Sequence, residues 1–150
     1  MTAIFVSPRV QFIAWLAALA FLAVITVGCG PSDKLFPVHA VSGKVSFQGK
    51  APEGAQVFLK PVNAPTDANY TPIGVVGSDG AFQVSTYGKN DGAPAGEYVA
   101  FVQWFRVVTN DGATGRGPNV IPKEFASPTT SPVKVTVKEG SNVIPDIVIK

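Results

Sequence analysis

The side chains that could do chemistry are few in this chain and form no catalytic pattern. Its 150 residues include one His, His39, and one Cys, Cys29. A zinc site needs three or four His, Cys or carboxylate ligands, and a serine nucleophile needs a base beside it. We therefore predict no catalytic residue, metal or cofactor, and expect His39 to be a solvated residue at the start of a strand.

Three Asp-Gly pairs are the other polar feature, at Asp79, Asp91 and Asp111. Oxygen-rich loops of this kind can hold calcium. Asp before Gly is first of all a turn signal, because Asp bonds to its own backbone and Gly accepts a positive φ. We interpret all three pairs as turns.

An apolar run occupies residues 10–27, interrupted only by Gln11 and Thr26, with Arg9 before it and Gly28 after it. A positive start, an apolar run and a small residue are typical of a secretory signal peptide, here residues 1–28. The run also has about the 20 residues of a membrane-spanning helix, so an uncleaved N-terminal anchor is the alternative. Either interpretation places the rest of the chain outside the cytoplasm.

Cys29 favours the first interpretation. Residues 25–29, Ile-Thr-Val-Gly-Cys, resemble the lipobox of bacterial lipoproteins, which are cut before a Cys that then carries the acyl chains. The resemblance implies cleavage between Gly28 and Cys29, lipidation of Cys29, and a lipoprotein at the periplasmic face or the cell surface. Residues 29–37 are short, polar and Pro-containing, and read as a tether before a domain at 38–150.

The charge balance argues against polyanionic partners. Charged residues make up 15% of the chain and the formal net charge is only +2. Proteins that bind nucleic acid carry a dense basic surface, so we predict no nucleic-acid partner.

The body of the chain alternates apolar and polar residues in short segments separated by Gly and Pro, with no helical period. This pattern predicts strands, and their 8–12-residue spacing favours an all-β antiparallel sandwich, with a small barrel as the alternative. The seven predicted strands are residues 39–48, 55–61, 73–77, 81–87, 97–108, 133–138 and 143–150.

The stretch 78–105 is the expected centre of the fold. Residues 78–80, Ser-Asp-Gly, form a tight turn between the strands 73–77 and 81–87. Residues 81–87 and 97–105 flank a Gly- and Pro-rich connection, so they look like two strands joined across a turn.

The strand at 97–108 is apolar on both faces, with Tyr98, Ala100 and Val102 on one of them. If that face is the core, the other face is an exposed patch that could contact a partner. Alternatively, residues 109–132, expected to be a long loop packing back through Ile121 and Phe125, fold over it. The candidate interaction patch comprises Phe58, Val99, Phe101, Phe105 and Val107.

Six segments carry a family resemblance: residues 41–45, 49–55, 79–82, 86–98, 121–125 and 135–140. In their order and spacing they resemble bacterial lipoproteins with a carboxypeptidase-regulatory-like, or transthyretin-like, domain. The resemblance implies a prealbumin-like, seven-stranded Greek-key sandwich with no activity common to the family.

One enzyme family with this fold, the hydroxyisourate hydrolases, needs paired His residues, an Arg and a C-terminal Tyr-Arg-Gly-Ser. This chain has one His and ends Ile-Val-Ile-Lys, so that chemistry does not carry over. We expect a lipid-anchored, non-catalytic binding or structural module of the cell envelope with a protein or glycan partner. The alternative is an accessory subunit of an envelope enzyme or transporter, and an enzyme in its own right ranks third.

Overall fold

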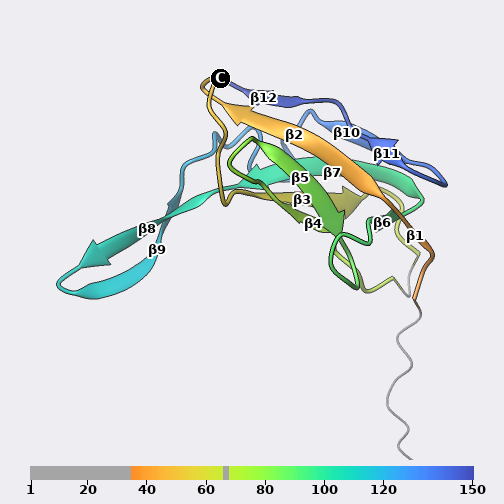
Figure 1. Ribbon diagram of the computed structural model, residues 1–150, viewed down its shortest axis with the longest axis horizontal. Coiled ribbons are helices and arrows are strands. Elements are labelled where there is room, and N and C mark those ends of the chain that lie inside the picture. Colours follow the sequence, from red (N-terminus) through yellow and green to blue (C-terminus); the bar gives the residue numbers. More distant parts are fainter. Residues whose placement is uncertain (1–34, 66–67) are drawn as a thin grey trace, which may run out of the picture. The chain divides into compact units, whose positions relative to one another are not determined.

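The computed structural model describes residues 35–65 and 68–150. The predicted signal peptide, the predicted cleavage site at Gly28 and the predicted acylation of Cys29 all fall outside these residues. All regular structure in the described part is β, so the all-β prediction is confirmed (Figure 1). Within the same residues, no helix has the length and apolar character needed to cross a membrane.

The described residues form twelve strands where the sequence predicted seven, because three predicted strands are each broken in two, and β6 and β9 form in segments predicted as loops. The strands are β1 (Val38–His39), β2 (Val41–Phe47), β3 (Gln56–Pro61), β4 (Ile73–Val75), β5 (Ala81–Ser85), β6 (Ala93–Pro94), β7 (Gly96–Gln103), β8 (Phe105–Asn110), β9 (Ala113–Asn119), β10 (Lys134–Val137), β11 (Asn142–Val143) and β12 (Ile147–Ile149).

Eight strands form the main sheet, in the order β10-β7-β3-β4-β5-β2-β11, with β12 also paired to β2. The sheet curls so that β2 and β12 face β3 and β7, and β5 lies where the two halves join (Figure 1). Most neighbours are antiparallel, but β11 and β12 both run parallel to β2. The predicted purely antiparallel sandwich is wrong at this edge. The chain crosses from β10, at one edge of the sheet, to the other edge, where β11 and β12 run in the same direction as β2.

The core lies between the two halves, and the predicted alternation locates it correctly. Val41 and Val45 of β2, Val57 and Leu59 of β3, and the Tyr98 face of β7 are all buried. Tyr98 also donates a hydrogen bond from its hydroxyl to the Pro94 carbonyl at 2.7 Å. Burial raises the pKa of this phenol, because the charged form would lose its hydration.

Phe82 of β5 fits between two glycines on the flanking strands. A Cβ at Gly43 of β2 would lie 2.6 Å from Ile144 Cγ1 and 2.9 Å from Phe82 Cζ, and one at Gly74 of β4 would lie 2.6 Å from Phe82 Cδ2. The ring is 3% exposed. Glycine at both positions therefore leaves the space that this ring occupies.

The predicted hairpin across 78–80 is confirmed, since β4 and β5 pair antiparallel. Asp79 Oδ1 accepts the Ala81 N–H at 3.0 Å, as expected of a turn residue. In contrast, 81–87 and 97–105 do not form a hairpin. β5 pairs with β4 and β2, whereas β7 pairs with β3 and β10.

The predicted single strand 97–108 is broken at Trp104. The last pair of β7 joins Gln103 to Gln56, the first residue of β3, so the ladder has no partner beyond it. Asn119 Oδ1 then accepts the backbone N–H groups of Trp104 at 2.9 Å and Ile121 at 3.1 Å. The chain continues as β8, which pairs with β9 instead of the main sheet.

Residues 109–132 are not one long loop, as the sequence had suggested. Their first part turns at Asp111 and Gly112, which have φ values of 49° and 80°, and returns as β9. The remainder follows the edge of β7, where the Val102 N–H donates to the Phe125 carbonyl at 2.8 Å. Ile121 is buried and Phe125 packs on the core, which confirms both predicted packing points.

We predict that Gly43→Ala destabilises the domain because the new methyl group must displace Ile144 or the Phe82 ring. Overpacking of this kind costs about 1–3 kcal/mol. Urea unfolding followed by tryptophan fluorescence will measure it. Gly115→Ala is the control, since nothing lies within 4 Å of a Cβ there. Equal stability of the two variants would contradict the packing role assigned to Gly43.

Candidate functional site

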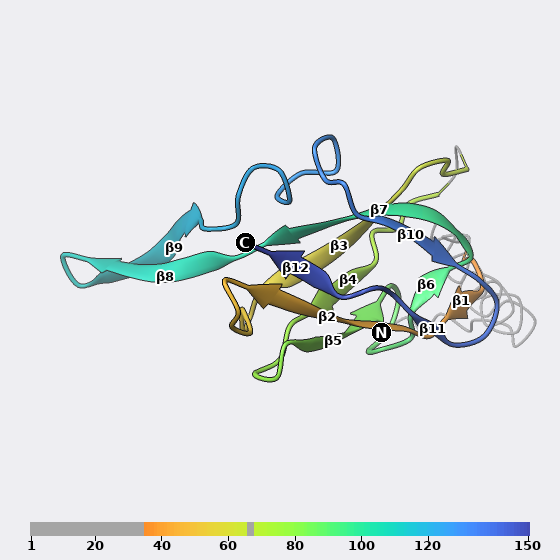
Figure 2. The same ribbon diagram turned by 90° about the horizontal axis from the view of Figure 1, so that it is seen from above.

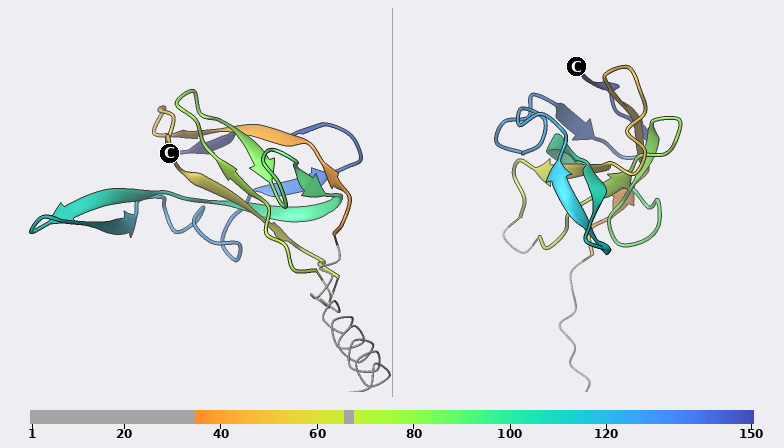
Figure 3. Two further views of the ribbon diagram at one scale, coloured as in Figure 1. Left: turned by 60° about the horizontal axis from the view of Figure 1, so that its bottom comes forward. Right: turned by 90° about the vertical axis from the view of Figure 1, so that its left-hand side faces the viewer.

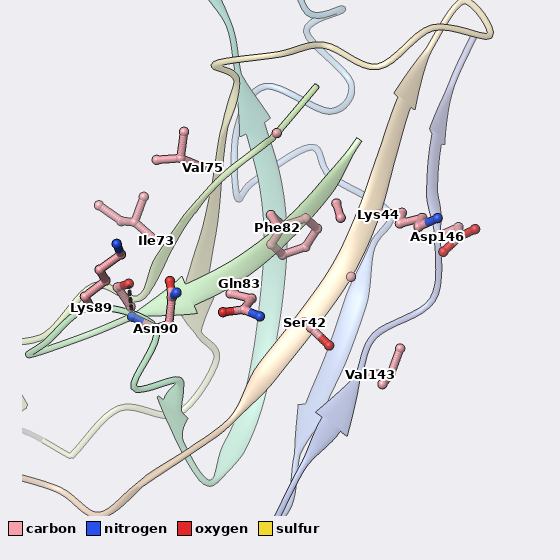
Figure 4. A pocket seen from close by; sticks show the side chains of 14 residues that line it. Ser42, Lys44, Ile73, Val75, Phe82, Gln83, Lys89, Asn90, Val143 and Asp146 are labelled. Atoms are coloured by element: carbon pink, nitrogen blue, oxygen red, sulfur yellow. Dashed lines mark hydrogen bonds between the residues drawn. The ribbon is translucent and has the colours of Figure 1, made fainter. Parts of the chain in front are cut away.

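An open groove of about 790 Å³ lies on the outer face of β4, β5 and β2 (Figure 4). Its volume is within the usual range of small-molecule sites, roughly 300–1,000 Å³. The lining combines neutral polar, charged and apolar side chains from the three strands, the 86–92 turn and the segment after β10. The main contributors are Ser42, Lys44, Ile73, Val75, Gln83, Ser85, Lys89, Asn90, Val143 and Asp146.

Strand alternation puts the polar side chains in the groove. Because Val41 and Val45 face the core, Ser42 and Lys44 face outward. Gln83 faces outward for the same reason, and the register places it directly opposite Ser42. The hydroxyl of Ser42 and the amide of Gln83 therefore lie side by side on the outer face, where both can form hydrogen bonds.

The apolar part of the groove comes from β4 and from the end of β11. Ile73 and Val75 point outward from β4, and Val75 is 59% exposed. Val143 lies on the opposite side of the groove (Figure 4) and is 81% exposed. Polar groups therefore occupy the middle of the groove, and apolar side chains flank it.

The turn after β5 supplies one wall, and Asp91 holds this turn in place. Its carboxylate accepts three backbone N–H groups, from Thr86 and Gly88 at 2.7 Å and from Tyr87 at 3.0 Å. The Asn90 N–H donates to Ser85 Oγ at 2.8 Å, the hydrogen bond drawn in Figure 4. Together these bonds fix the backbone that presents Lys89 and Asn90 to the groove.

The conformation of this turn also depends on its glycine. Asn90 has a φ of 57°, and Gly92 follows with a φ of 96°. A Cβ on Gly92 would overlap the carbonyl oxygen of His39. No other residue fits there without moving β1, so Gly92 locks the turn against the start of the first strands.

The hydrogen bonds to Asp91 dominate its titration. Partial burial acts to raise the pKa of this carboxyl, but the N–H groups of Thr86, Gly88 and Tyr87 lower it below its usual value of 3.8. Backbone donors aimed at a carboxylate favour its charged form. Asp91 is consequently a structural anion, and its two oxygens are already occupied by the turn.

Charged groups lie at both ends of the groove. Lys44 and Asp146 lie close together on one side, and Lys89 lies on the other (Figure 4). This spacing leaves the neutral residues Ser42, Gln83 and Asn90 between the charges. The arrangement can bind a polar ligand by many hydrogen bonds, with one carboxylate and two cations at its ends.

The described residues contain no cluster of three or more His, Cys, Asp or Glu side chains that could hold a metal ion. His39 Nδ1 accepts the Gly140 N–H at 3.2 Å, so this ring ties β1 to the turn before β11. Asp111 lies in the β8–β9 turn at positive φ. The polar residues singled out in the sequence thus shape turns and strand ends.

The structure divides the predicted interaction patch into two parts. Phe58 and Phe101 are cross-strand partners whose rings stack 5.0 Å apart on the outer face of β3 and β7. Val99 also belongs to β7 but is only 8% exposed. Phe105 and Val107 lie beyond the main sheet on β8, where Arg116 covers the Phe105 ring at 3.4 Å.

Sequence reasoning missed the groove. Apolar and polar residues alternate along β2 and β5, but nothing in the sequence shows that these two strands are neighbours. The combination of an Asp and a Gly after Asn90 was the available signal that this turn is rigid.

No family model and no curated protein matches this chain. Among solved structures, the chain is similar to a protein from Pseudomonas aeruginosa described as a candidate carbohydrate-binding protein. That similarity has a TM-score of 0.40 and 14% identity, and covers 77% of this chain and 90% of that one.

A second similar structure is a DUF3823 family protein from Parabacteroides merdae, with a TM-score of 0.38 and 23% identity. It aligns with 74% of this chain. This chain spans 45% of the length of that protein.

We predict that Asp91→Asn destabilises the domain by about 1–3 kcal/mol at neutral pH, because an amide replaces one acceptor oxygen with a donor. The lowered pKa means that the stabilisation by Asp91 is complete above its usual value of 3.8 and is lost as the pH falls through the lowered value. Urea midpoints measured from pH 2 to 7 should therefore converge for the variant and wild type at the acidic end.

Asp111→Asn in the β8–β9 turn is the control for removing one negative charge. A constant difference between Asp91→Asn and wild type at every pH would contradict the assignment of this carboxylate as the anion that holds the turn.

Proposed function

We propose that this chain is a non-catalytic binding module that holds a glycan in the groove over β4, β5 and β2. The observation that carries the proposal is the preformed row of neutral hydrogen-bonding side chains, Ser42, Gln83 and Asn90, between apolar flanks. Hydroxyl and amide groups can both donate and accept hydrogen bonds. A sugar ring offers the matching chemistry, with hydroxyls at its edge and C–H groups on its faces.

The groove is open along its length, which suits an extended ligand. It runs across three strands whose backbones are fixed by the main sheet, and its wall at Asn90 is fixed by Asp91. A rigid site loses little conformational entropy when the ligand binds. The polar residues are therefore organised for binding before the ligand arrives.

The absence of catalysis is part of the proposal. Hydrolysis of a glycosidic bond normally uses two carboxyl groups, about 5–9.5 Å apart, on either side of the bond. Among the described residues that line the groove, Asp146 is the one carboxylate. Asp91 faces its own turn, and His39 is engaged by Gly140.

We also propose that the module is an exported lipoprotein with a carboxypeptidase-regulatory-like domain. The support is the apolar segment within 1–28, the Gly28-Cys29 pair of the lipobox, and the tether 29–37. Acyl chains on Cys29 would anchor the chain at the periplasmic face or the cell surface, since two buried chains give stable attachment where one is marginal.

A second candidate function is that of an accessory subunit in an envelope enzyme or transporter. The observation that favours it is the β8–β9 hairpin, which extends away from the main sheet (Figure 2). A projecting hairpin of this kind can reach a neighbouring protein while the groove stays open.

Glycan binding is tested by calorimetric titration of the full chain in mild detergent with neutral, amino-sugar and uronic-acid oligosaccharides. We predict that at least one of them binds saturably. Gln83→Ala should lower its affinity about five-fold, the effect of losing a hydrogen bond of roughly 1 kcal/mol. Gln103→Ala, on the outer face of β7, is the matched control and should bind like wild type. No saturable binding, or equal affinity for the two variants, would refute the groove as a glycan site.

Lipidation is tested by labelling cells with radioactive palmitate. We predict that the wild-type chain carries the label and sediments with membranes, whereas Cys29→Ser carries none, since Cys29 is the only thiol in the chain. Label that persists in Cys29→Ser would contradict the lipoprotein assignment.

A further inference from the structure

The hairpin of β8 and β9, residues 105–119, is here called the arm. It projects beyond the main sheet in Figures 1 and 2 and in the left view of Figure 3. Most of its side chains are exposed, and Val107 has 73% of its surface accessible. A two-stranded ribbon without further partners is only marginally stable in water. The arm therefore has backbone edges and apolar surface that a third strand could cover.

The turn of the arm determines which backbone groups are free. Asp111 and Gly112 both have positive φ, as in a type I′ turn, so Asn110 and Ala113 form a hydrogen-bonded pair. Hydrogen-bonded and non-hydrogen-bonded pairs alternate along an antiparallel ladder. The N–H and C=O groups of Val107 and Thr109 consequently point away from β9, along the outer edge of β8.

The two edges of the arm differ in their ability to accept another strand. β9 contains Gly115, Gly117 and Pro118, and Pro has no N–H to donate to a ladder. The sequence of β8 from 105 to 110, Phe-Arg-Val-Val-Thr-Asn, has neither Gly nor Pro and includes three β-branched residues. The edge of β8 is thus the one suited to pairing.

We propose that this edge pairs with β8 of a second copy of the chain, antiparallel, about a two-fold axis through Val107. Val107 then faces Val107 of the second copy, and Phe105 faces its Thr109. The two arms together form a four-stranded sheet in the order β9, β8, β8, β9. Such an interface is isologous, because each copy contributes the same residues.

The residues of β8 are compatible with pairing to a second copy of the same strand. In this register the exposed Val107 side chains bury each other on the axis, and Arg106 faces Val108 rather than another arginine. Like charges directly opposite each other would destabilise the pairing, and the register avoids them. Two short strands bury less than the roughly 1,200 Å² of a stable interface, so the dimer is expected to be weak.

The experiment is site-directed crosslinking of the full chain in cells with a short bis-maleimide. Wild type, whose one cysteine is Cys29, gives the background. Val107→Cys should give a crosslinked dimer several-fold above Val148→Cys, a control on β12 that lies outside the groove and whose valine is 57% exposed. Thr114→Cys, on the opposite edge of the arm, should also give only background.

A second pair of variants tests the backbone bonds. Thr109→Pro removes an outward N–H from β8 and should abolish the Val107→Cys crosslink, whereas Thr114→Pro removes the equivalent group from β9 and should leave it. Both groups point away from the β8–β9 ladder, so neither change breaks the arm itself. Equal crosslinking at positions 107 and 148, or a crosslink that survives Thr109→Pro, would overturn the proposal.

Discussion

The ring of Phe82 fills the space that Gly43 and Gly74 leave on the two strands beside it. β5, which carries this ring, joins the β2 half of the sheet to the β3 and β7 half. A side chain on Gly74 would displace the ring, and one on Gly43 would displace the ring or Ile144. The packing of β5 between β2 and β4 therefore depends on one aromatic residue and two glycines.

The proposed binding site uses the other face of the same three strands. The residues between the core positions, Ser42 of β2 and Gln83 of β5, point outward and meet across the β2–β5 ladder. Packing on the inner face sets the spacing of these outward side chains, which are proposed to contact the ligand. The groove is then completed by the turn that Asp91 holds through three backbone N–H groups.

The arm shows how a strand behaves when its ladder ends. β7 loses its partner after Gln103, since β3 begins at Gln56, and the chain leaves the sheet at Trp104. The apolar alternation of 97–108 continues across this point without a sign of the change. A sequence pattern reports the side-chain period of a strand, but it does not report which strand lies beside it.

The sequence by itself determined the all-β class, the core faces of β2 and β3, and the turns at Asp79 and Asp91. These features are local, because they follow from alternation along one strand or from the backbone preferences of Asp and Gly. Only the tertiary structure decided that β11 and β12 run parallel to β2, that 81–87 and 97–105 are not partners, and that 109–132 begins with a hairpin. Strand order and register depend on contacts between segments that are distant in the sequence. The placement of Gln83 opposite Ser42 in the groove depends on such contacts too.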